Sequence, residues 1–315
     1  MKISYLSSGG LITNYFCTSR CAHCLYACSP SWSKQYITTD VVRTNLRKIK
    51  SLGCSSIHVG GGEPLLQPDK LAKTLDIARS ENVNIEYVET NSSWFKDEAS
   101  AIRVLIRLKE SGLSMLLVSI SPFHNRYIPF YKVKGVINAS GKAGIAIFPW
   151  IQEFYPEIDQ MDDRKIHRPD DFRKLFGEDY FAKIPGRYWV HLGGRAIQTY
   201  KDVFEMRPFE AILESAAGCH ELTDTSHFHV DLFGHYIPGL CSGLSIRVND
   251  LGKELNSETY PFISTLYHQG IKGFFEYAKS EYHYTPGEEY LNKCHICNDI
   301  RNYLIHSIKL KSSEL

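Results

Sequence analysis

Three cysteines near the start of the chain have the spacing of metal ligands. Cys17, Cys21 and Cys24 form a C-x-x-x-C-x-x-C segment. Thiolates bind both zinc and iron–sulfur clusters, and structural sites of either kind usually take four protein ligands. Three thiolates on one short loop therefore predict a four-iron cluster whose fourth iron has no protein ligand and is open to a small molecule. The alternative is a zinc loop in which Cys28 or His23 is the fourth ligand.

A second group of four cysteines lies in the last third of the chain. Four is the number of thiolates that a closed iron–sulfur cluster requires, and zinc held by the same thiolates is the alternative. The chain has nine cysteines and no export signal, which indicates metal or redox chemistry rather than a disulfide framework. The four are Cys219, Cys241, Cys294 and Cys297.

A glycine-rich segment, Gly60-Gly61-Gly62-Glu63-Pro64, follows the second predicted strand. Alone, it would be only a tight turn. With the first cysteine loop before it, in this order and after successive strands, it resembles the radical SAM superfamily, which carries both motifs. The resemblance implies a [4Fe-4S] cluster on Cys17, Cys21 and Cys24, and S-adenosylmethionine chelated by the open iron.

The same resemblance implies contacts to the cofactor. His23 would pack near the adenine. The backbone of the segment from Gly61 and Gly62 to Glu63 and Pro64 would pair with the methionine amino group, and glycine would be needed because a side chain would block that approach. Polar strand ends and one arginine would contact the ribose and the carboxylate, although such residues also occur where no ligand binds. These are Asn91, Ser119 and Arg195.

The segment 228–238, followed by Cys241, resembles the hairpin of SPASM and Twitch domains, which add an iron–sulfur cluster to radical SAM barrels. The four remaining cysteines fit the shorter Twitch type. In the usual hairpin proline directly precedes cysteine, whereas Gly239 and Leu240 intervene here. The resemblance therefore implies a second iron–sulfur cluster, with structural zinc as the alternative.

Two cysteines remain as candidates for a catalytic thiol. Cys28 belongs to a Cys-Ser-Pro element that also occurs in radical SAM peptide epimerases. In such an enzyme a thiol returns a hydrogen atom to a peptide radical, and Cys28 or Cys54 would supply it here. The alternative for both is simple packing, since a free cysteine often behaves as a small buried apolar side chain.

The elements that must position these residues alternate between strand and helix. Apolar strand centres recur about every 30 residues, which is the length of a βαβ unit. The pattern predicts an α/β fold with a parallel sheet, bent into a partial (β/α)6 TIM-type barrel over 1–205, and a small auxiliary-cluster module over 206–315. A sixth strand is predicted at 188–192 and a hairpin at 228–237. Ligands bind at the carboxyl ends of such strands.

The composition of the chain narrows the range of functions that it could have. The chain has 315 residues, 43% of them hydrophobic, and 36 basic against 35 acidic residues give a net charge of +1. There is no strong positive field to attract nucleic acid or acidic lipid, and no apolar run suited to a membrane, so we expect a cytoplasmic protein without either partner.

We therefore expect a radical SAM enzyme that cleaves S-adenosylmethionine reductively and takes a hydrogen atom from a peptide or small-molecule substrate, as a peptide epimerase or another maturase. An external flavodoxin or ferredoxin would supply electrons. The alternative is a non-catalytic iron–sulfur electron carrier or a zinc-stabilised binding module, which would have no use for the glycine-rich turn.

Overall fold

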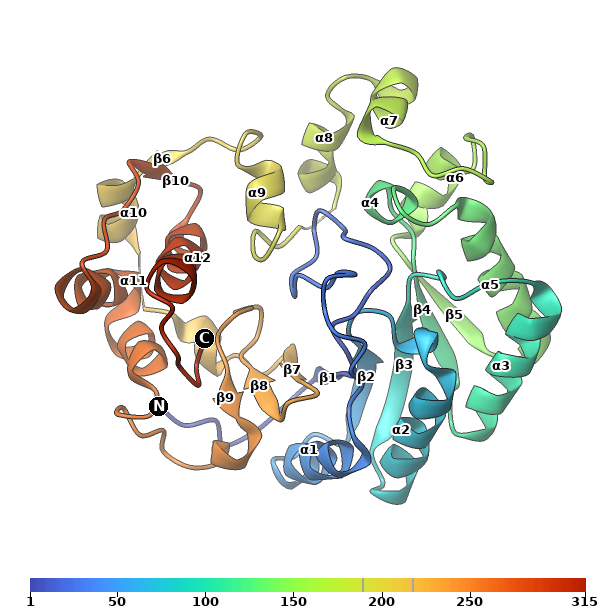
Figure 1. Cartoon of the computed structure of the whole chain (residues 1–315), viewed down its shortest axis with the longest axis horizontal. Helices are drawn as coiled ribbons and strands as arrows, with labels where there is room; N and C mark the ends of the chain where they lie inside the picture. The colour runs from blue at the N-terminus through green and yellow to red at the C-terminus, as the bar shows by residue number, and fades with distance from the viewer. Residues whose placement is uncertain (189, 217) are drawn as a thin grey trace.

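The computed structural model describes residues 1–188, 190–216 and 218–315, in which strands and helices alternate along the first half of the chain (Figure 1). The strands are β1 (Gly9–Ile12), β2 (Ser56–Gly60), β3 (Asn84–Thr90), β4 (Met115–Ser119), β5 (Ala146–Trp150), β6 (Arg207–Pro208), β7 (Phe228–Val230), β8 (His235–Ile237), β9 (Ile246–Arg247) and β10 (Glu289–Tyr290). The helices are α1 (Thr39–Ser51), α2 (Pro68–Ser80), α3 (Glu98–Glu110), α4 (Pro122–Asn125), α5 (Phe130–Ala143), α6 (Tyr155–Ile158), α7 (Pro169–Phe176), α8 (Tyr180–Arg187), α9 (Ala196–Tyr200), α10 (Phe209–Ser215), α11 (Pro261–Tyr282) and α12 (Lys293–Asn302).

One eight-stranded sheet organises the molecule, in the order β5-β4-β3-β2-β1-β7-β8-β9. The pairs from β5 to β7 are all parallel, and only β7-β8 and β8-β9 are antiparallel. Helices α1, α2, α3 and α5 cover the outer face (Figure 1). Between strands β5 and β9 the sheet stays open, so the predicted α/β fold of partial-barrel type is confirmed.

The sixth parallel strand is not where the sequence pattern placed it. Tyr188 and residues 190–192 belong to no strand, and Trp189 lies outside the described residues. The side chains of Tyr188, Val190 and His191 instead line a cavity. The place beside β1 is taken by β7, whose Phe228 and Val230 are fully buried. The predicted hairpin at 228–237 is confirmed as β7 and β8.

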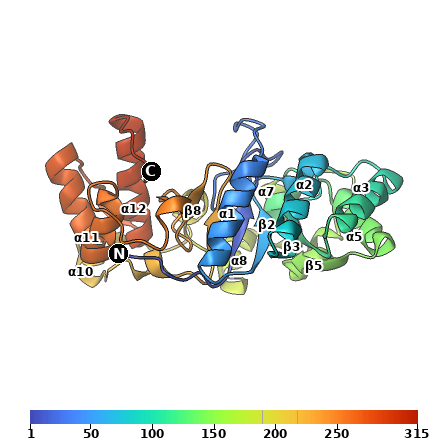
Figure 2. The ribbon, with the colours of Figure 1, turned by 90° about the horizontal axis from the view of Figure 1, so that it is seen from below.

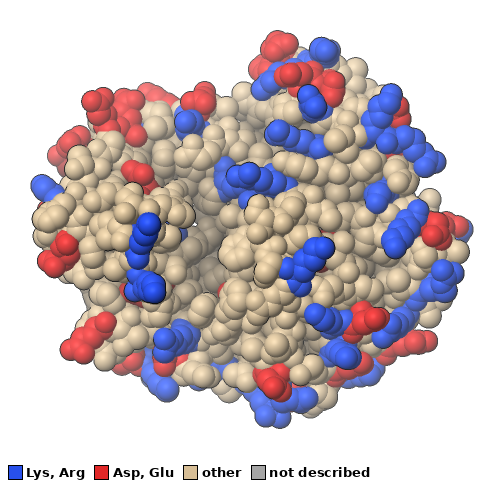
Figure 3. All heavy atoms as spheres, viewed as in Figure 1, with Lys and Arg blue, Asp and Glu red and all other residues tan. Residues whose placement is uncertain are grey.

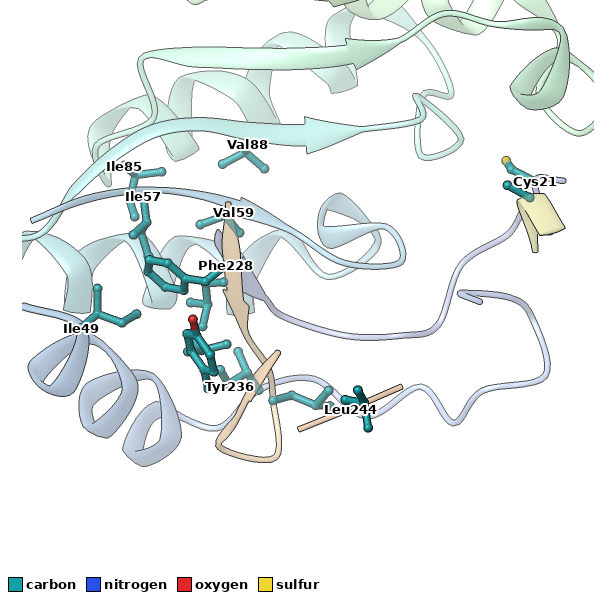
Figure 4. Packing of buried hydrophobic residues seen from close by; sticks show 14 of the residues in the cluster. Cys21, Ile49, Ile57, Val59, Ile85, Val88, Phe228, Tyr236 and Leu244 are labelled. Carbon is teal, nitrogen blue, oxygen red and sulfur yellow. The ribbon is translucent and has the colours of Figure 1, made fainter. Parts of the chain in front are cut away.

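The hairpin shares its hydrophobic core with the N-terminal strands. Figure 4 shows Phe228 and Tyr236 beside Ile49 of α1 and Ile57 of β2. The join with β1 requires glycine, because a Cβ on Gly9 would lie 2.3 Å from the carbonyl oxygen of Phe228. Burial of such side chains stabilises the join by about 1.5–3 kcal/mol each.

The C-terminal helices α10, α11 and α12 lie at one end of the molecule and α3 and α5 at the other, with β8 between them (Figure 2). Strands β6 and β10 form a separate antiparallel pair beside these helices. The boundary between 205 and 206 stays a prediction, and β7 from beyond it joins the main sheet. No helix in the described part of the chain is both long and apolar enough to cross a lipid bilayer.

Candidate active site

A cavity of about 340 Å³ opens at the carboxyl ends of the parallel strands. The loop after β1 borders it, and the thiols of Cys17 and Cys21 there are only 6% and 7% exposed. Strands β2, β3 and β4 contribute residues from their ends. Of the residues predicted from sequence, those lining this cavity are Cys17, Cys21, His23, Cys24, Cys28, Gly61, Gly62, Asn91, Ser119 and Arg195.

Arg195 fixes the shape of the cysteine loop. Its Nε donates to the carbonyl oxygen of Cys21 at 2.9 Å, and its Nη2 donates to that of Cys28 at 2.8 Å. Its backbone N–H donates to the carbonyl of Cys24 at 3.2 Å. These three hydrogen bonds connect Arg195 to three positions along the cysteine loop and so stabilise the shape of the loop. In the structure the guanidinium of Arg195 stabilises the cysteine loop. A contact between this guanidinium and the cofactor carboxylate stays a prediction.

Glu63 ties the glycine-rich turn to the end of β3. Its fully buried carboxylate accepts hydrogen bonds from the Leu65 N–H at 3.2 Å, the Thr90 hydroxyl at 2.9 Å and the Asn91 N–H at 2.6 Å. The Asn91 side chain in turn donates to Sγ of Cys17 at 3.3 Å. One connected set of contacts therefore runs from the turn to the first cysteine.

Burial raises the pKa of Glu63 from 4.5 to about 7, against the lowering effect of its hydrogen bonds. The folded state therefore binds the proton more tightly than the unfolded chain. Compared with Glu63→Gln, the wild type is expected to lose about 3 kcal/mol of stability as the pH rises from below 4.5 to above 7. Urea unfolding of both proteins at a series of pH values measures this difference, and parallel curves would contradict it.

Gly61 and Gly62 are required by packing against the cysteine loop, a reason that is separate from the expected approach of the cofactor. A Cβ on Gly62 would lie 2.0 Å from the carbonyl oxygen of Phe16, and one on Gly61 would lie 2.5 Å from that of Asn14. The Gly62 N–H also donates to the Asn14 carbonyl at 2.7 Å. The turn therefore packs directly against the backbone of the cysteine loop, so glycine serves this packing whether or not it also admits a cofactor.

Replacing Gly62 by alanine is expected to displace the cysteine loop, because backbone at 2.0 Å cannot yield as a flexible side chain would. We expect a loss of stability of 1–3 kcal/mol or more, about the range for overpacking a core, and poor assembly of the metal site. Gly141→Ala in α5 is the matched control, since nothing lies within 4 Å of its added Cβ. That variant should gain up to about 1 kcal/mol. Chemical unfolding and iron content test both, and equal behaviour would contradict the role of the contact.

His23 is half-buried beside the cysteines, and its buried Nδ1 atom has no hydrogen-bond partner among the described residues. Its ring lies 4.7 Å from that of Phe123 and 5.1 Å from that of His124, between centroids. Burial, with a smaller effect of Arg195, lowers its pKa to about 4, so the ring is neutral at pH 7. Its Nδ1 makes no hydrogen bond to the described residues. A buried polar atom without a partner fits a site shaped for a ligand.

The three thiols of the cysteine loop border one cavity, and in a cubane each thiolate binds a different iron. In the described part of the chain, no group of three or more Cys, His, Asp or Glu side chains is arranged to hold a single metal ion. A hydrogen bond from Cys28 lowers the pKa of Cys24 to about 6, which favours its thiolate form.

The two candidates for a catalytic thiol lie in different places. Cys28 is 3% exposed and lines the cavity next to Cys24. Cys54 precedes β2, at the opposite end of that strand from Gly60, and its Sγ donates to the carbonyl of Ser56 at 3.2 Å. The structure does not bring Cys54 to the cavity.

The four C-terminal cysteines line a second cavity, of about 360 Å³. Cys294 and Cys297 lie on one face of α12, three residues apart, after the N-cap Asn292. Cys219 and Cys241 come from the loops before β7 and after β8. The two cavities share three lining residues, His191, His227 and Leu240. Figure 3 shows a hollow between the C-terminal helices and the N-terminal loop.

The sequence analysis missed a polar group on the inner face of the sheet. His58 of β2 and His229 of β7 bond through their Nε2 atoms at 3.0 Å, across Gly10 of β1. Nδ1 of His229 bonds the Tyr26 hydroxyl at 2.7 Å. Glu89 of β3 lies beside them, 3.8 Å from His58. In the sequence, the only sign of this polar group is that polar residues such as His227 and His229 occur at alternating positions. The two-residue period of a strand explains that pattern without any functional role.

Comparison with known proteins agrees with this geometry. Residues 11–144 match the model of the Radical SAM superfamily. The cysteine loop and the glycine-rich turn both lie inside the matched segment, which is less than half of the chain. The similarity of this segment implies a [4Fe-4S] cluster and S-adenosylmethionine, which the cavity lined by Cys17, Cys21 and Cys24 fits.

Particular relatives are distant. GTP 3',8-cyclase of Actinobacillus succinogenes is 26% identical over 121 residues, which is 38% of this chain and 34% of the cyclase. The match therefore spans about a third of that relative. Native anSMEcpe with bound AdoMet has a TM-score of 0.47 and 15% identity, covering 96% of this chain and 98% of that one. SuiB of Streptococcus suis with precursor peptide SuiA has a TM-score of 0.36 and 14% identity, covering 86% and 67%.

Proposed function

We propose that this protein cleaves S-adenosylmethionine reductively and removes a hydrogen atom from a C–H bond of a peptide. One observation carries the proposal. Cys17, Cys21 and Cys24 line the same cavity as the glycine-rich turn and the polar strand ends Asn91 and Ser119. The match of this region to an enzyme superfamily favours catalysis over the non-catalytic carrier or zinc module.

The chain's own residues would bind, orient and shield the reactants. The bound cluster and S-adenosylmethionine would supply a 5'-deoxyadenosyl radical as the hydrogen-abstracting agent. Arg195 holds the cysteine loop in shape, and Glu63 and Asn91 connect the turn to Cys17. The aromatic ring of Phe123 and the neutral ring of His23 exclude water from the side of the cavity where the adenine is expected.

A second iron–sulfur cluster on Cys219, Cys241, Cys294 and Cys297 belongs to the same proposal. Its support is that all four thiols line one cavity, which adjoins the first through His191, His227 and Leu240. An external flavodoxin or ferredoxin would supply electrons. All nine cysteines are free thiols, which suits a reducing compartment such as the cytoplasm.

The decisive experiment uses the full chain reconstituted anaerobically with iron and sulfide. Incubation with S-adenosylmethionine and dithionite should produce 5'-deoxyadenosine. The electron paramagnetic resonance spectrum of the reduced N-terminal cluster should change when S-adenosylmethionine is added. A fully loaded protein that forms no 5'-deoxyadenosine and shows no spectral change would overturn the proposal.

Among peptide reactions we favour epimerisation, because Cys28 borders the cavity as a buried thiol. Its S–H would return a hydrogen atom to the substrate carbon radical. The resulting sulfur radical would then take one electron from the external donor and one proton from solvent. A thiol exchanges its hydrogen with solvent, so product formed in D2O should gain one deuterium.

Cys28→Ala should stop deuterium incorporation into a pool of synthetic peptides while 5'-deoxyadenosine still forms. Cys54→Ala is the matched control, since its thiol lies away from the cavity. Mass spectrometry of the peptides measures the incorporation. If Cys28→Ala incorporates deuterium as the wild type does, the thiol of Cys28 is not the donor.

A further inference from the structure

Glu89 is a carboxylate in the cavity without a matching cation. It lies on β3, lines the cavity, and its side chain is 40% exposed there. Within 4 Å of its oxygens the described residues provide a single basic nitrogen, Nε2 of His58, at 3.8 Å. That separation is too long for a hydrogen bond. Its position inside the cavity raises the pKa of Glu89 to about 7, mainly through partial loss of solvation and with a smaller effect of Cys24.

The neighbouring histidines do not neutralise Glu89. Nδ1 of His229 bonds the Tyr26 hydroxyl, and Nε2 of His229 bonds Nε2 of His58. When Tyr26 donates to His229 and His229 donates to His58, each contact holds one proton and both rings are neutral. Burial lowers the pKa of His58 to about 3 and that of His229 well below its usual value, which keeps them neutral.

The other charged residue lining the cavity is also engaged. Arg195 donates from Nε and Nη2 to carbonyl oxygens of the cysteine loop. Glu89 and Arg195 are the only Asp, Glu, Lys or Arg side chains among the described residues that line this cavity. The cavity therefore presents one carboxylate whose charge is balanced by no lining residue.

The walls around Glu89 also suit a cation. Tyr87 lines the cavity, and its ring stacks on that of His58 with a centroid distance of 5.1 Å. Trp150 lines the cavity and is 40% exposed. Aromatic faces attract ammonium and guanidinium groups, by about 0.5–2 kcal/mol. A carboxylate in a cavity that Tyr87 and Trp150 also line suits a positively charged organic group.

Glu89 reaches deeper than the segments assigned to the cofactor. Its Oε2 would lie 2.6 Å from a Cβ on Gly60, and its Oε1 faces His58. The carboxylate thus lies at the level of residues 58 to 60 of β2, below the turn that begins at Gly61. The cysteine loop and the ends of β3 and β4 border the upper part of the cavity, where S-adenosylmethionine is expected.

From these contacts we infer that the substrate carries an ammonium or guanidinium group that pairs with Glu89, which selects lysine- or arginine-containing peptides. This inference rests on the proposed function and specifies its substrate. The attacked C–H bond would then belong to that basic residue or to one next to it in the peptide. Glu89 would bind and orient the substrate, with no part in the radical step.

The experiment uses the reconstituted holoenzyme with S-adenosylmethionine and measures binding by equilibrium dialysis. The probes are acetylated and amidated tripeptides with alanine flanks and lysine, norleucine or glutamate in the centre, and n-butylamine as a free amine. The lysine peptide should bind about tenfold or more tightly than the norleucine peptide, because only lysine completes an ion pair with Glu89 inside the cavity. Binding of n-butylamine at similar strength would identify a free amine rather than a peptide as the source of the charge.

Glu89→Gln should remove the preference for lysine, whereas Glu86→Gln should keep it. Glu86 lies on the same strand and faces solvent, so it is a matched control. Equal binding of lysine and norleucine peptides by the wild type, or an unchanged preference in Glu89→Gln, would overturn the inference. So would loss of the S-adenosylmethionine effect on the cluster spectrum in Glu89→Gln, because Glu89 would then serve the cofactor. Failure of the proposed function would instead appear as absence of that spectral effect in the wild type.

Discussion

Replacing Cys24 by alanine is expected to abolish formation of 5'-deoxyadenosine. The variant keeps only two of the three thiolates that border the first cavity, and two thiolates cannot hold a four-iron cluster with one open iron. Iron content should fall by about half, since a second cluster would remain. Cleavage of S-adenosylmethionine with dithionite, iron analysis and the spectrum of the reduced protein measure these losses.

Two other cysteines of the same chain are the controls for this prediction. Cys54→Ala changes a thiol buried away from the cavity and should keep full iron content and full cleavage. Cys28→Ala changes a thiol that borders the same cavity and should keep the cluster as well. If Cys28→Ala loses the iron while Cys24→Ala keeps it, the ligand set is wrong, and the loop binds its metal through a different cysteine.

The repeated strand and helix units could be predicted because each leaves a local signal. Strands β2 and β4 contain short apolar runs, β3 alternates apolar and polar residues, and helices α2 and α3 carry apolar residues at helical spacing. Helix α1, for example, begins after the N-cap Thr38, whose hydroxyl accepts a hydrogen bond from the Val41 N–H.

The sixth strand could not be found from local pattern. Residues 188–192 are a mostly apolar run like that of a strand, but Tyr188, Val190 and His191 line a cavity and belong to no strand. Strand β7 has only three residues and pairs with β1, more than 200 positions earlier in the chain. Such a pairing is decided by long-range contacts, among them the close approach of Gly9 to Phe228, that no window of sequence contains.

The residues of the site also divide into those with a local sequence signal and those brought together by long-range contacts. The cysteine loop and the glycine-rich turn are contiguous motifs, and the structure brings both to one cavity. The packing role of the glycines could not be predicted, because the backbone of Asn14 and Phe16 that they touch is distant in sequence. Their role toward the cofactor stays a prediction. Glu89 and His58 are single polar residues inside strands, and their meeting depends on the register of β2 and β3.

Replacing Cys294 by alanine is expected to remove the second cluster and leave the first. Cys294 is in the first turn of α12, and its thiol lines the second cavity with the three other C-terminal cysteines. With three thiolates left, a closed site loses one of its four ligands. Iron should fall by about half, while the effect of S-adenosylmethionine on the spectrum of the first cluster persists.

Metal analysis of this variant also separates the two metals considered for the C-terminal site. If the four thiols hold zinc, Cys294→Ala should lose zinc and keep all of its iron. Because the cavities adjoin through His191, His227 and Leu240, electrons have a short route between two clusters but none through zinc, which has no redox chemistry. Substrate turnover should therefore fall in Cys294→Ala far more than cleavage of S-adenosylmethionine without substrate. Equal losses of both activities would instead indicate that the C-terminal site only stabilises the fold.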